Sequence, residues 1–342
     1  MRVCVTGATG FLGRAVVRRL LREGMAVCAL ARPSARAEEL ATSGAEVVRG
    51  DLGDPAAIAR AVAGANVVYH VAAMVEAPGD LADFLDANRG GTERVFHAAL
   101  QNGVRHIVYT SSIAVYGLVR EGGLIDENTP YDQRPELRDA YSQSKIQADA
   151  FAVSFARQIA EQQMAEQNVN SGAGRNRWSI TILRPGVIYG PGKRLPFGLL
   201  GFAAGKLSVI FANRNNRIPL NYIENLVDAM LLAASSDHRS LRQYIVLDDD
   251  DLTLAQYHAA RKEVEGTHAL FFSGRPVAAA ARFAEAIGLV KAGAGDFSVR
   301  QVQRALQNRR YSTQGIRVEL GWRPRVSLRD ALRASLNPAE GA

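Results

Sequence analysis

The stretch that most constrains this chain lies at its start, in residues 3–13 (Val-Cys-Val-Thr-Gly-Ala-Thr-Gly-Phe-Leu-Gly). Its first residues predict a short buried strand, and residues 14–21 place apolar side chains at helical spacing. In the turn between them, Gly7 permits a tight bend, Gly10 allows a pyrophosphate to approach the backbone, and Gly13 lets the helix pack against the strand. The N-terminus of the helix then offers a phosphate site. The spacing is GxxGxxG instead of the commoner GxGxxG, so an ordinary strand-to-helix turn is the alternative.

Length and composition limit the class of protein. The 342 residues allow about two domains, and the 47% hydrophobic content is that of an ordinary globular protein. No apolar run approaches the roughly 18 residues of a membrane span, and the N-terminus has no signal-peptide pattern. Cys4 and Cys28 fall in strand-like runs, so we expect buried thiols in a cytoplasmic protein, with neither a disulfide nor a metal site. The net charge of +7 comes from arginines spread over many segments, which favours a solvated surface over a nucleic-acid partner.

Strand and helix patterns alternate along the first third of the chain. Strand-like runs occur at residues 25–30, 46–52, 67–73 and 105–112, with helical patterns at 55–63 and 80–102. Short connections in such a β-α-β series predict a parallel sheet. We therefore predict an α/β protein, a Rossmann-type doubly wound parallel sheet with a smaller, mostly helical C-terminal substrate domain.

The end of the second strand indicates which dinucleotide is bound. NAD-binding versions of this fold carry an acidic residue there, about 20 residues past the glycines, to accept the ribose 2′-hydroxyl. This chain has Arg32 at that place. An arginine pairs with a 2′-phosphate, so NADP(H) is favoured over NAD(H); the alternative is that Arg32 is only a loop charge.

Hydroxyl groups gather at the end of the fifth strand, where residues 110–112 read Thr-Ser-Ser. Ligands of open α/β sheets bind outside the carboxyl ends of the strands, which makes Ser112 a candidate site residue. The same cluster also suits a turn or a helix cap.

Tyr141 and Lys145 form a YxxxK pair inside a helical pattern at residues 139–151. Residues four apart lie on one helix face, so the lysine can lower the pKa of the tyrosine from its usual value near 10. Such a tyrosine exchanges a proton with a carbonyl or alcohol oxygen at neutral pH. Taken alone, the pattern also fits a surface pair without a function.

Together, and in this order, the motifs resemble the extended short-chain dehydrogenase/reductase family, the NAD(P)-dependent epimerase/dehydratase group. The similarity rests on residues 7–13, 51–52, 110–117, 141–145 and 183–192 and continues through 311–324. It implies that Ser112, Tyr141 and Lys145 are catalytic. It also implies a cofactor-binding set, with the last two residues lining the nicotinamide end: Gly7, Thr9, Gly10, Phe11, Leu12, Gly13, Arg32, Asp51, Leu52, Ala72, Tyr141, Lys145, Pro185 and Val187.

The branch of the family is indicated by residues 184–190, which read Arg-Pro-Gly-Val-Ile-Tyr-Gly. Members acting on nucleotide sugars usually carry an asparagine in this stretch. This chain has none there. Its Arg-Pro-Gly form resembles the 3β-hydroxysteroid dehydrogenase and dihydroflavonol-reductase-like members, which act on less polar alcohols and ketones. Arg217 lies one residue out of register with the arginine that grips a sugar nucleotide's diphosphate. The sequence therefore favours a substrate other than a nucleotide sugar, and a nucleotide sugar stays the alternative.

We expect residues 1–186, with 218–248 returning to them, to form the dinucleotide-binding domain, and residues 187–217 and 249–336 to form the substrate-binding region. The polar stretch 161–177 is longer than the family needs. Its turn-forming residues predict an extension of the preceding helix followed by a surface-loop insertion.

The predicted function is that of an NAD(P)-dependent oxidoreductase, a ketone or aldehyde reductase or an alcohol dehydrogenase. Tyr141 exchanges a proton with the substrate oxygen, Ser112 hydrogen-bonds the same oxygen, and Lys145 holds the cofactor ribose. The partner is a small, fairly apolar substrate, and the family resemblance implies a homodimer. Two alternatives stay open: a nucleotide-sugar epimerase or dehydratase that recycles its NAD internally, and a non-catalytic NAD(P)-binding sensor.

Overall fold

The computed structural model describes residues 1–75, 77–117, 123–169, 178–193, 201–235, 241–286 and 307–336. Contacts between residues divide the chain into two compact units, each built from separate stretches of sequence. Unit 1 comprises Met1–Val115, Gln143–Arg184 and Leu226–Tyr244. Unit 2 comprises Tyr116–Ser142, Pro185–Asn225 and Ile245–Ala342.

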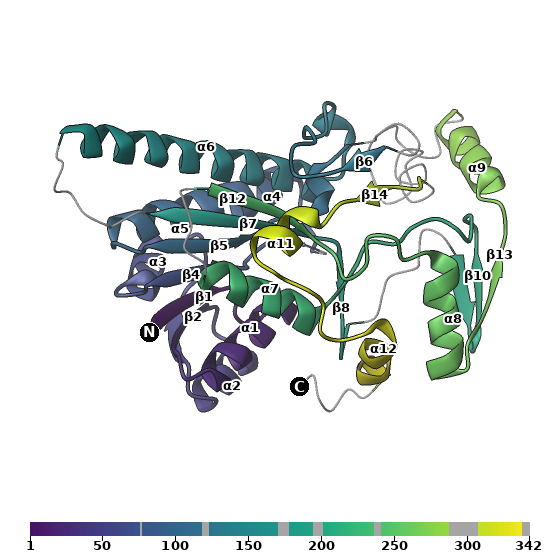
Figure 1. Cartoon of the computed structure of the whole chain (residues 1–342), viewed down its shortest axis with the longest axis horizontal. Coiled ribbons are helices and arrows are strands. Elements are labelled where there is room, and N and C mark those ends of the chain that lie inside the picture. Colours follow the sequence, from purple (N-terminus) through teal and green to yellow (C-terminus); the bar gives the residue numbers. More distant parts are fainter. Residues whose placement is uncertain are drawn as a thin grey trace. The chain divides into compact units, whose positions relative to one another are not determined.

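The strands and helices are labelled in Figure 1. The strands are β1 (Arg2–Thr6), β2 (Ala26–Ala31), β3 (Glu46–Arg49), β4 (Val67–His70), β5 (His106–Thr110), β6 (Leu124–Ile125), β7 (Ser179–Pro185), β8 (Val187–Tyr189), β9 (Gly201–Ala204), β10 (Leu207–Ile210), β11 (Leu220–Tyr222), β12 (Leu241–Val246), β13 (His268–Phe271) and β14 (Arg310–Tyr311). The α-helices are α1 (Phe11–Arg22), α2 (Ala35–Thr42), α3 (Pro55–Val62), α4 (Leu81–Phe84), α5 (Gly91–Gln101), α6 (Ala140–Val169), α7 (Ile223–Ser235), α8 (Leu254–Glu265), α9 (Arg275–Ala286), α11 (Gln314–Glu319) and α12 (Leu328–Leu336).

A seven-stranded sheet forms the centre of unit 1, in the order β12-β7-β5-β4-β1-β2-β3 (Figure 1). The chain enters at β1, winds outward through β2 and β3, and returns on the other side of β1 to β4, β5 and β7, with parallel pairing at each of these steps. The predicted doubly wound parallel sheet is confirmed. Its winding reverses beside β1, and in such sheets the crevice at that point is where ligands bind.

One face of this sheet is covered by α3, α5 and α6, whose buried residues join alternate sheet residues in a single apolar cluster. Phe96 of α5 lies at its centre, with ring centroids 5.8 Å from Tyr109, 5.8 Å from Phe155 and 6.4 Å from Trp178. The cluster fixes α6 against β5, and it therefore holds the helix that carries Lys145.

Residues 80–102, predicted as one α-helix, are instead α4, a π-helical segment at Leu85–Gly90 and α5. Asn88 lies in the π-helical segment and is buried. Its side chain accepts from the Met74 N–H at 2.6 Å and donates to the Met74 carbonyl at 3.0 Å. The wider π-helical turn orients the Asn88 side chain toward Met74, 14 residues away in the sequence, a contact that local spacing does not predict.

The long helix α6 continues to Val169, as predicted for the first part of the stretch 161–177, while residues 170–177 lie outside the described ones. Unit 2 contains the three-stranded sheet β13-β10-β9 and two small parallel pairs, β8 with β11 and β6 with β14. Its helix α8 packs against α12 and supplies Leu254 to a small core with Ile210. Among the described residues no helix is long and apolar enough to cross a membrane.

Candidate active site

The glycine turn joins β1 to α1, and its three glycines differ in what surrounds them. Gly7 has a φ of +69°, and a Cβ there would lie 2.6 Å from Cα of Ala72. A Cβ on Gly13 would lie 2.0 Å from the Gly7 carbonyl oxygen. Gly10 is less confined, because its Cβ would meet that same oxygen at 3.2 Å. The fold itself requires glycine at positions 7 and 13, whereas Gly10 leaves space that a ligand can use.

The first turn of α1 suits an anion. Gly10 is its N-cap and supplies no side-chain acceptor to the first N–H groups, and the turn contains no acidic residue. These N–H groups and the helix dipole favour a negative group at this end. Thr9 and Phe11 beside the turn are half-buried, and Leu12 is buried.

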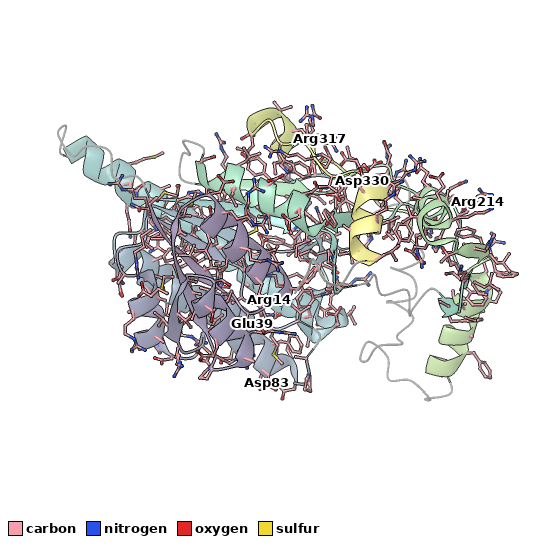
Figure 2. The ribbon with its side chains drawn as sticks, turned by 90° about the horizontal axis from the view of Figure 1, so that it is seen from below. Arg14, Glu39, Asp83, Arg214, Arg317 and Asp330 are labelled. Atoms are coloured by element: carbon pink, nitrogen blue, oxygen red, sulfur yellow. The ribbon has the colours of Figure 1, made fainter. Side chains whose placement is uncertain are left out.

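Arginines gather past the end of β2. Arg32 follows the strand and Arg36 lies in the first turn of α2, both exposed. Arg14 reaches this region from α1, and Figure 2 shows its side chain beside Glu39. Burial, followed by the charges of Arg36 and Arg18, lowers the pKa of Arg14. Its Nε is shielded from solvent and has no hydrogen-bond partner in the described part of the chain. The charge of Glu39 opposes this lowering of the pKa. A half-buried guanidinium with a shielded, unpartnered Nε is an arrangement that an anionic ligand stabilises.

Asp51, Leu52 and Ala72 lie at the carboxyl ends of β3 and β4. The Asp51 carboxylate is exposed and accepts from the Gly53 N–H at 2.8 Å. Leu52 packs against Gly91, where an added Cβ would lie 2.6 Å from Cδ1 of Leu52. The Ala72 N–H donates to Oγ1 of Thr6 at 3.3 Å. All three therefore lie at the carboxyl ends of the strands, where the glycine turn also lies.

His70 ends β4 and is fully buried. Its Nδ1 lies 2.7 Å from Oγ1 of Thr6, and its Nε2 lies 3.0 Å from Oγ1 of Thr92. Its ring stacks on Tyr109 with centroids 5.4 Å apart. Burial, assisted by the charge of Lys145, lowers the pKa of His70 to about 3. The imidazole is thus neutral at physiological pH. His70 is not among the site residues predicted from the sequence, and its place at a strand end was the available signal.

Lys145 is also buried, one helical turn after Tyr141 on α6. Its Nζ donates to the Thr110 carbonyl at 2.9 Å and to the Tyr109 hydroxyl at 3.2 Å. Burial lowers the pKa of Lys145 to about 8, and the negative charge of Asp149 opposes that shift. The ammonium group is therefore fixed at the carboxyl end of β5 and close to titration at neutral pH.

Ser112 lies two residues past the end of β5 and is half-buried. Its Oγ accepts from the Ala114 N–H at 3.1 Å. The hydroxyl hydrogen therefore remains a potential donor to a ligand. Both Ser112 and Lys145 belong to unit 1. Ser112 lies just past the end of β5, and Lys145 donates to the carbonyl of Thr110, the last residue of that strand.

A buried cluster centred on Asp149, not predicted from the sequence, supports these residues. Arg184 donates to Asp149 from Nε at 3.0 Å and from Nη2 at 2.6 Å. The Ser111 hydroxyl donates to Oδ2 of the same carboxylate. Nη2 of Arg184 also donates to Oε1 of Gln243 at 2.6 Å. The cluster thereby ties α6 to β5, β7 and β12, and its only sequence signal is an acid one turn after Lys145.

Asn88 forms a second link to α6. Its Nδ2 donates to Oγ of Ser144 at 2.8 Å, while Thr92 donates from Oγ1 to the Asn88 carbonyl at 2.6 Å. Because Thr92 also contacts His70, a continuous polar chain runs from Thr6 at the glycine turn to the residue before Lys145.

Tyr141 stands in the first turn of α6 and is half-buried. The Ser142 N–H donates to Oδ1 of Asp139 at 2.8 Å, which caps this helix end. The boundary between the units falls inside α6, after Ser142, so Tyr141 belongs to unit 2. The helix itself sets Tyr141 and Lys145 four residues apart on one face.

Pro185 and Val187 also belong to unit 2, on either side of Gly186. A Cβ on Gly186 would lie 2.4 Å from the Pro219 carbonyl oxygen. The Gly186 N–H donates to Oδ1 of Asn221 at 2.7 Å, and Val187 begins β8 with 38% of its surface exposed. The backbone here is fixed while the Val187 side chain is accessible.

Arg217, the residue near the position of a diphosphate-gripping arginine, is already paired. Its Nε donates to Oδ1 of Asp251 at 2.7 Å, and its N–H donates to Oδ1 of Asn308 at 3.0 Å. Cys4 and Cys28 are buried free thiols, and burial raises the pKa of Cys28 to about 11. In the part of the chain that the structure describes, no group of three or more His, Cys, Asp or Glu side chains is arranged to hold a metal ion.

A doubly wound parallel sheet with a glycine turn at the reversal of its winding defines a Rossmann-type protein, and comparison with known proteins specifies which kind. The pattern of the NAD dependent epimerase/dehydratase family matches residues 3–246. The chain belongs to this family.

Two relatives and one solved structure illustrate the range of similarity. A 2-alkyl-3-oxoalkanoate reductase of Shewanella oneidensis is 30% identical over 260 residues, 74% of this chain and 63% of that protein. A 3β-hydroxysteroid dehydrogenase/Δ5→4-isomerase of Mycobacterium tuberculosis is 33% identical over 248 residues, 68% of this chain and 60% of that protein. The match thus spans less than two thirds of the length of either relative. A UDP-glucuronic acid 4-epimerase of Bacillus cereus, solved with NAD, shares the fold with a TM-score of 0.70, 17% identity and coverage of 99% and 97%.

Proposed function

We propose that this chain is an NADP(H)-dependent oxidoreductase that interconverts a ketone or aldehyde and an alcohol. The observation that carries the proposal is the buried Lys145, one turn after Tyr141 and hydrogen-bonded to the carbonyl of Thr110. Burying an ammonium group is costly, and here the buried cation lies one helical turn after Tyr141 and at the end of β5, which Ser111 and Ser112 follow.

Each of the three residues has a distinct task. A bound nicotinamide supplies the hydride in reduction and accepts it in oxidation. Tyr141 gives its phenolic proton to the carbonyl oxygen in reduction and takes it back in oxidation. Ser112 donates a hydrogen bond to the same oxygen, and the Lys145 cation stabilises the developing phenolate of Tyr141 and holds the cofactor ribose. One hydride and one proton thus add across the carbonyl group.

The preference for NADP(H) is supported by the arginines past β2. Arg32 takes the place of the acidic residue that would bind a ribose 2′-hydroxyl, and Arg14 and Arg36 add positive charge to the same region. The room above Gly10 and the acid-free first turn of α1 fit a pyrophosphate. We accordingly assign dinucleotide binding to residues 1–186 with 218–248, and substrate binding to residues 187–217 and 249–336.

The substrate that we propose is a fairly apolar ketone or secondary alcohol. The named activities of the relatives, reduction of a 2-alkyl-3-oxoalkanoate and dehydrogenation of a 3β-hydroxysteroid, support this class. A nucleotide sugar is disfavoured, because Arg217 is paired with Asp251 and residues 184–190 lack an asparagine.

The test compares wild type with Tyr141→Phe in calorimetric titration with NADPH and NADH and in turnover of apolar ketones. We expect tighter binding of NADPH, consumption of NADPH with a ketone, and a turnover loss of about 100-fold or more in Tyr141→Phe at unchanged NADPH affinity. Wild-type turnover in Tyr141→Phe would overturn the mechanism. NAD retained through purification with no net NADPH consumption would favour the epimerase or dehydratase. Binding of NADPH without turnover of any ketone or sugar would favour the sensor.

We further propose that the protein is a cytoplasmic homodimer whose contact includes α6. Gln147, Ser154 and Arg157 are exposed along this helix and are available to such a contact. Light scattering after size-exclusion chromatography should give about twice the chain mass of 36.9 kDa, and the monomer mass would contradict it.

A further inference from the structure

The three-stranded sheet of unit 2 has two different faces. Its central strand β10 pairs antiparallel with β9 and in parallel with β13. Ser208 and Ile210 of β10 are buried, and Ile210 packs with Leu254 of α8, the helix that lies beside this sheet in Figure 1. Because successive side chains of a strand point to opposite faces, Leu207 and Val209 point away from α8.

This second face is apolar across all three strands. The register sets Val209 opposite Phe202 of β9 on one side and opposite Leu270 of β13 on the other, so the three side chains form a row. A further row lies just past the strand ends, where the ring centroids of Phe211 and Phe272 are 6.0 Å apart. We call the outer apolar face the set Phe202, Leu207, Val209, Phe211, Leu270 and Phe272.

The outer apolar face is exposed to solvent. Phe202, Leu270 and Phe272 have 60%, 48% and 50% of their surfaces exposed. Single exposed apolar side chains are common on soluble proteins, whereas a contiguous group of large ones marks an interaction site. These three lie on one face of one small sheet. We therefore interpret the face as a binding surface and not as part of a core.

Cations lie at both ends of this face. Lys206 precedes β10 in the turn from β9, and Arg275 comes three residues after Phe272, at the opposite end of the parallel strands β10 and β13. Both are exposed, and neither forms an ion pair with a residue in the described ranges. Residues 201–223 and 266–284, which supply the sheet and its flanks, contain no acidic residue. The surface is thus apolar in the middle and positive at its ends.

These charges indicate the chemistry of the partner. The acids at the end of α8 are already engaged, because Glu265 is paired with Arg261 and Glu263 with Arg329. A second copy of the chain bound through this face would bring cations against cations, since a two-fold contact joins a surface patch to itself. An anionic lipid surface instead offers phosphates to the cations and an apolar interior to the aromatic rings.

We propose that the outer apolar face docks on an anionic lipid membrane surface. Phe202 and Phe272 enter the boundary between head groups and acyl chains, while Lys206 and Arg275 lie at the lipid phosphates. The contact is peripheral and involves no membrane-spanning helix. This inference goes beyond the proposed oxidoreductase function and does not depend on it.

The test is flotation of the full chain with two kinds of vesicle, pure phosphatidylcholine and phosphatidylcholine with about one third phosphatidylglycerol. We expect wild type to bind the mixed vesicles about tenfold more tightly than the pure ones, and to bind them less tightly as salt is added. Wild type that stays unbound with the mixed vesicles would overturn the proposal.

The apolar contribution is tested with the double variant Phe202→Ser/Phe272→Ser. Its partition onto mixed vesicles should fall about tenfold or more, because two rings no longer leave water. The matched control is Val318→Ser, since Val318 of α11 is 71% exposed and lies outside the face. It should bind as wild type does. A double variant that binds as wild type does, or an equal loss in the control, would contradict the docking surface.

The electrostatic contribution is tested with Lys206→Gln/Arg275→Gln, which should weaken binding to mixed vesicles by roughly 10- to 30-fold. The double variant Arg22→Gln/Arg60→Gln removes the same charge from exposed positions of unit 1 and should bind nearly as wild type does. Equal losses in the two double variants would mean that net charge and not this face drives binding. Thermal unfolding checks that each variant is folded.

A substitution that adds a reporter avoids any loss of folding. Trp178 and Trp322 are buried, so in Leu270→Trp a lipid-dependent change in emission reports on the outer apolar face. The emission maximum should move to shorter wavelength with mixed vesicles, and an unchanged maximum would overturn the proposal. A wild-type dimer that becomes a monomer in Phe202→Ser/Phe272→Ser, without vesicle binding by either, would make the face a contact between copies instead.

Discussion

Asp149 and Arg184 form a buried pair in which Nη2 of the arginine lies 2.6 Å from Oδ1 of the carboxylate and Nε lies 3.0 Å from Oδ2. The carboxylate also accepts from Ser111, the residue before Ser112, and its charge acts on Lys145 one turn earlier on α6. This pair therefore holds the residue next to Ser112 and favours the charged form of the lysine. Two buried residues therefore support Ser112 and Lys145, which we expect to contact the substrate and the cofactor.

Removing the charge of Asp149 should destabilise the fold strongly. Asp149→Asn leaves the Arg184 cation buried without a counter-charge, which costs about 3–5 kcal/mol of the free energy of unfolding. Chemical denaturation measures this loss. The matched control is Glu38→Gln, which breaks the exposed pair with Arg49 and should cost less than about 1 kcal/mol. Similar losses in the two variants would contradict the prediction.

NADPH affinity should depend on the charge of Lys145. The pKa of Lys145 is lowered to about 8 by burial, so the unliganded protein loses this positive charge as the pH rises through that value. If binding requires the ammonium form, the NADPH Kd should rise about tenfold between pH 7 and pH 9. The Kd is measured by titration at both values.

Lys145→Arg is the control for this pH effect, because arginine stays protonated over the whole range. Its Kd should be nearly constant between pH 7 and pH 9. A constant Kd in wild type would show that Lys145 does not titrate in the unliganded protein.

Stability should fall on mild acidification because of His70. Its folded-state pKa is lowered to about 3, below the unfolded value near 6.5, so between these values the unfolded state binds a proton that the folded state excludes. This contribution is fully present above pH 6.5 and is lost as the pH falls. From pH 6.5 to 5 the loss is about 2 kcal/mol.

Denaturation curves of wild type and His70→Asn over this pH range isolate the effect, since other groups titrate in both. The free energy of unfolding should fall more steeply with decreasing pH in wild type than in the variant. Parallel pH dependence would mean that His70 is protonated in the folded protein.

Substitutions in the glycine turn should distinguish a glycine that the packing requires, Gly13, from one that ligand binding requires, Gly10. Gly13→Ala drives a Cβ to 2.0 Å from the Gly7 carbonyl oxygen, so we expect a loss of about 3 kcal/mol or more in stability, or an insoluble product. Gly10→Ala places its Cβ at 3.2 Å, at a φ of −76° that alanine adopts, so stability should change by no more than about 1 kcal/mol. NADPH affinity should nevertheless fall at least tenfold in Gly10→Ala, because the methyl group occupies the approach of the pyrophosphate. A well-folded Gly10→Ala protein with wild-type affinity would place the phosphates elsewhere.

The sequence alone determined the parts of this protein that depend on local spacing. The strand, glycines and helix of residues 2–22 are neighbours along the chain, and so are Tyr141 and Lys145 on one face of a helix. Apolar residues recur at the period of a strand or of a helix, so the elements can be identified from the sequence. Their alternation along the chain predicted the doubly wound sheet.

Contacts between residues far apart along the chain follow from the folded arrangement of the elements. Asp149 and Arg184 are 35 residues apart, and Asn88 and Ser144 are 56 apart, so their pairing depends on the order of the strands and on how α6 packs over them. Spacing along the chain predicts neither the burial of Lys145 nor the missing hydrogen-bond partner of Arg14 Nε among the described residues, because both depend on which other segments pack at the same place. A local pattern fixes the direction of a side chain, whereas its charge state and its partners are properties of the folded environment.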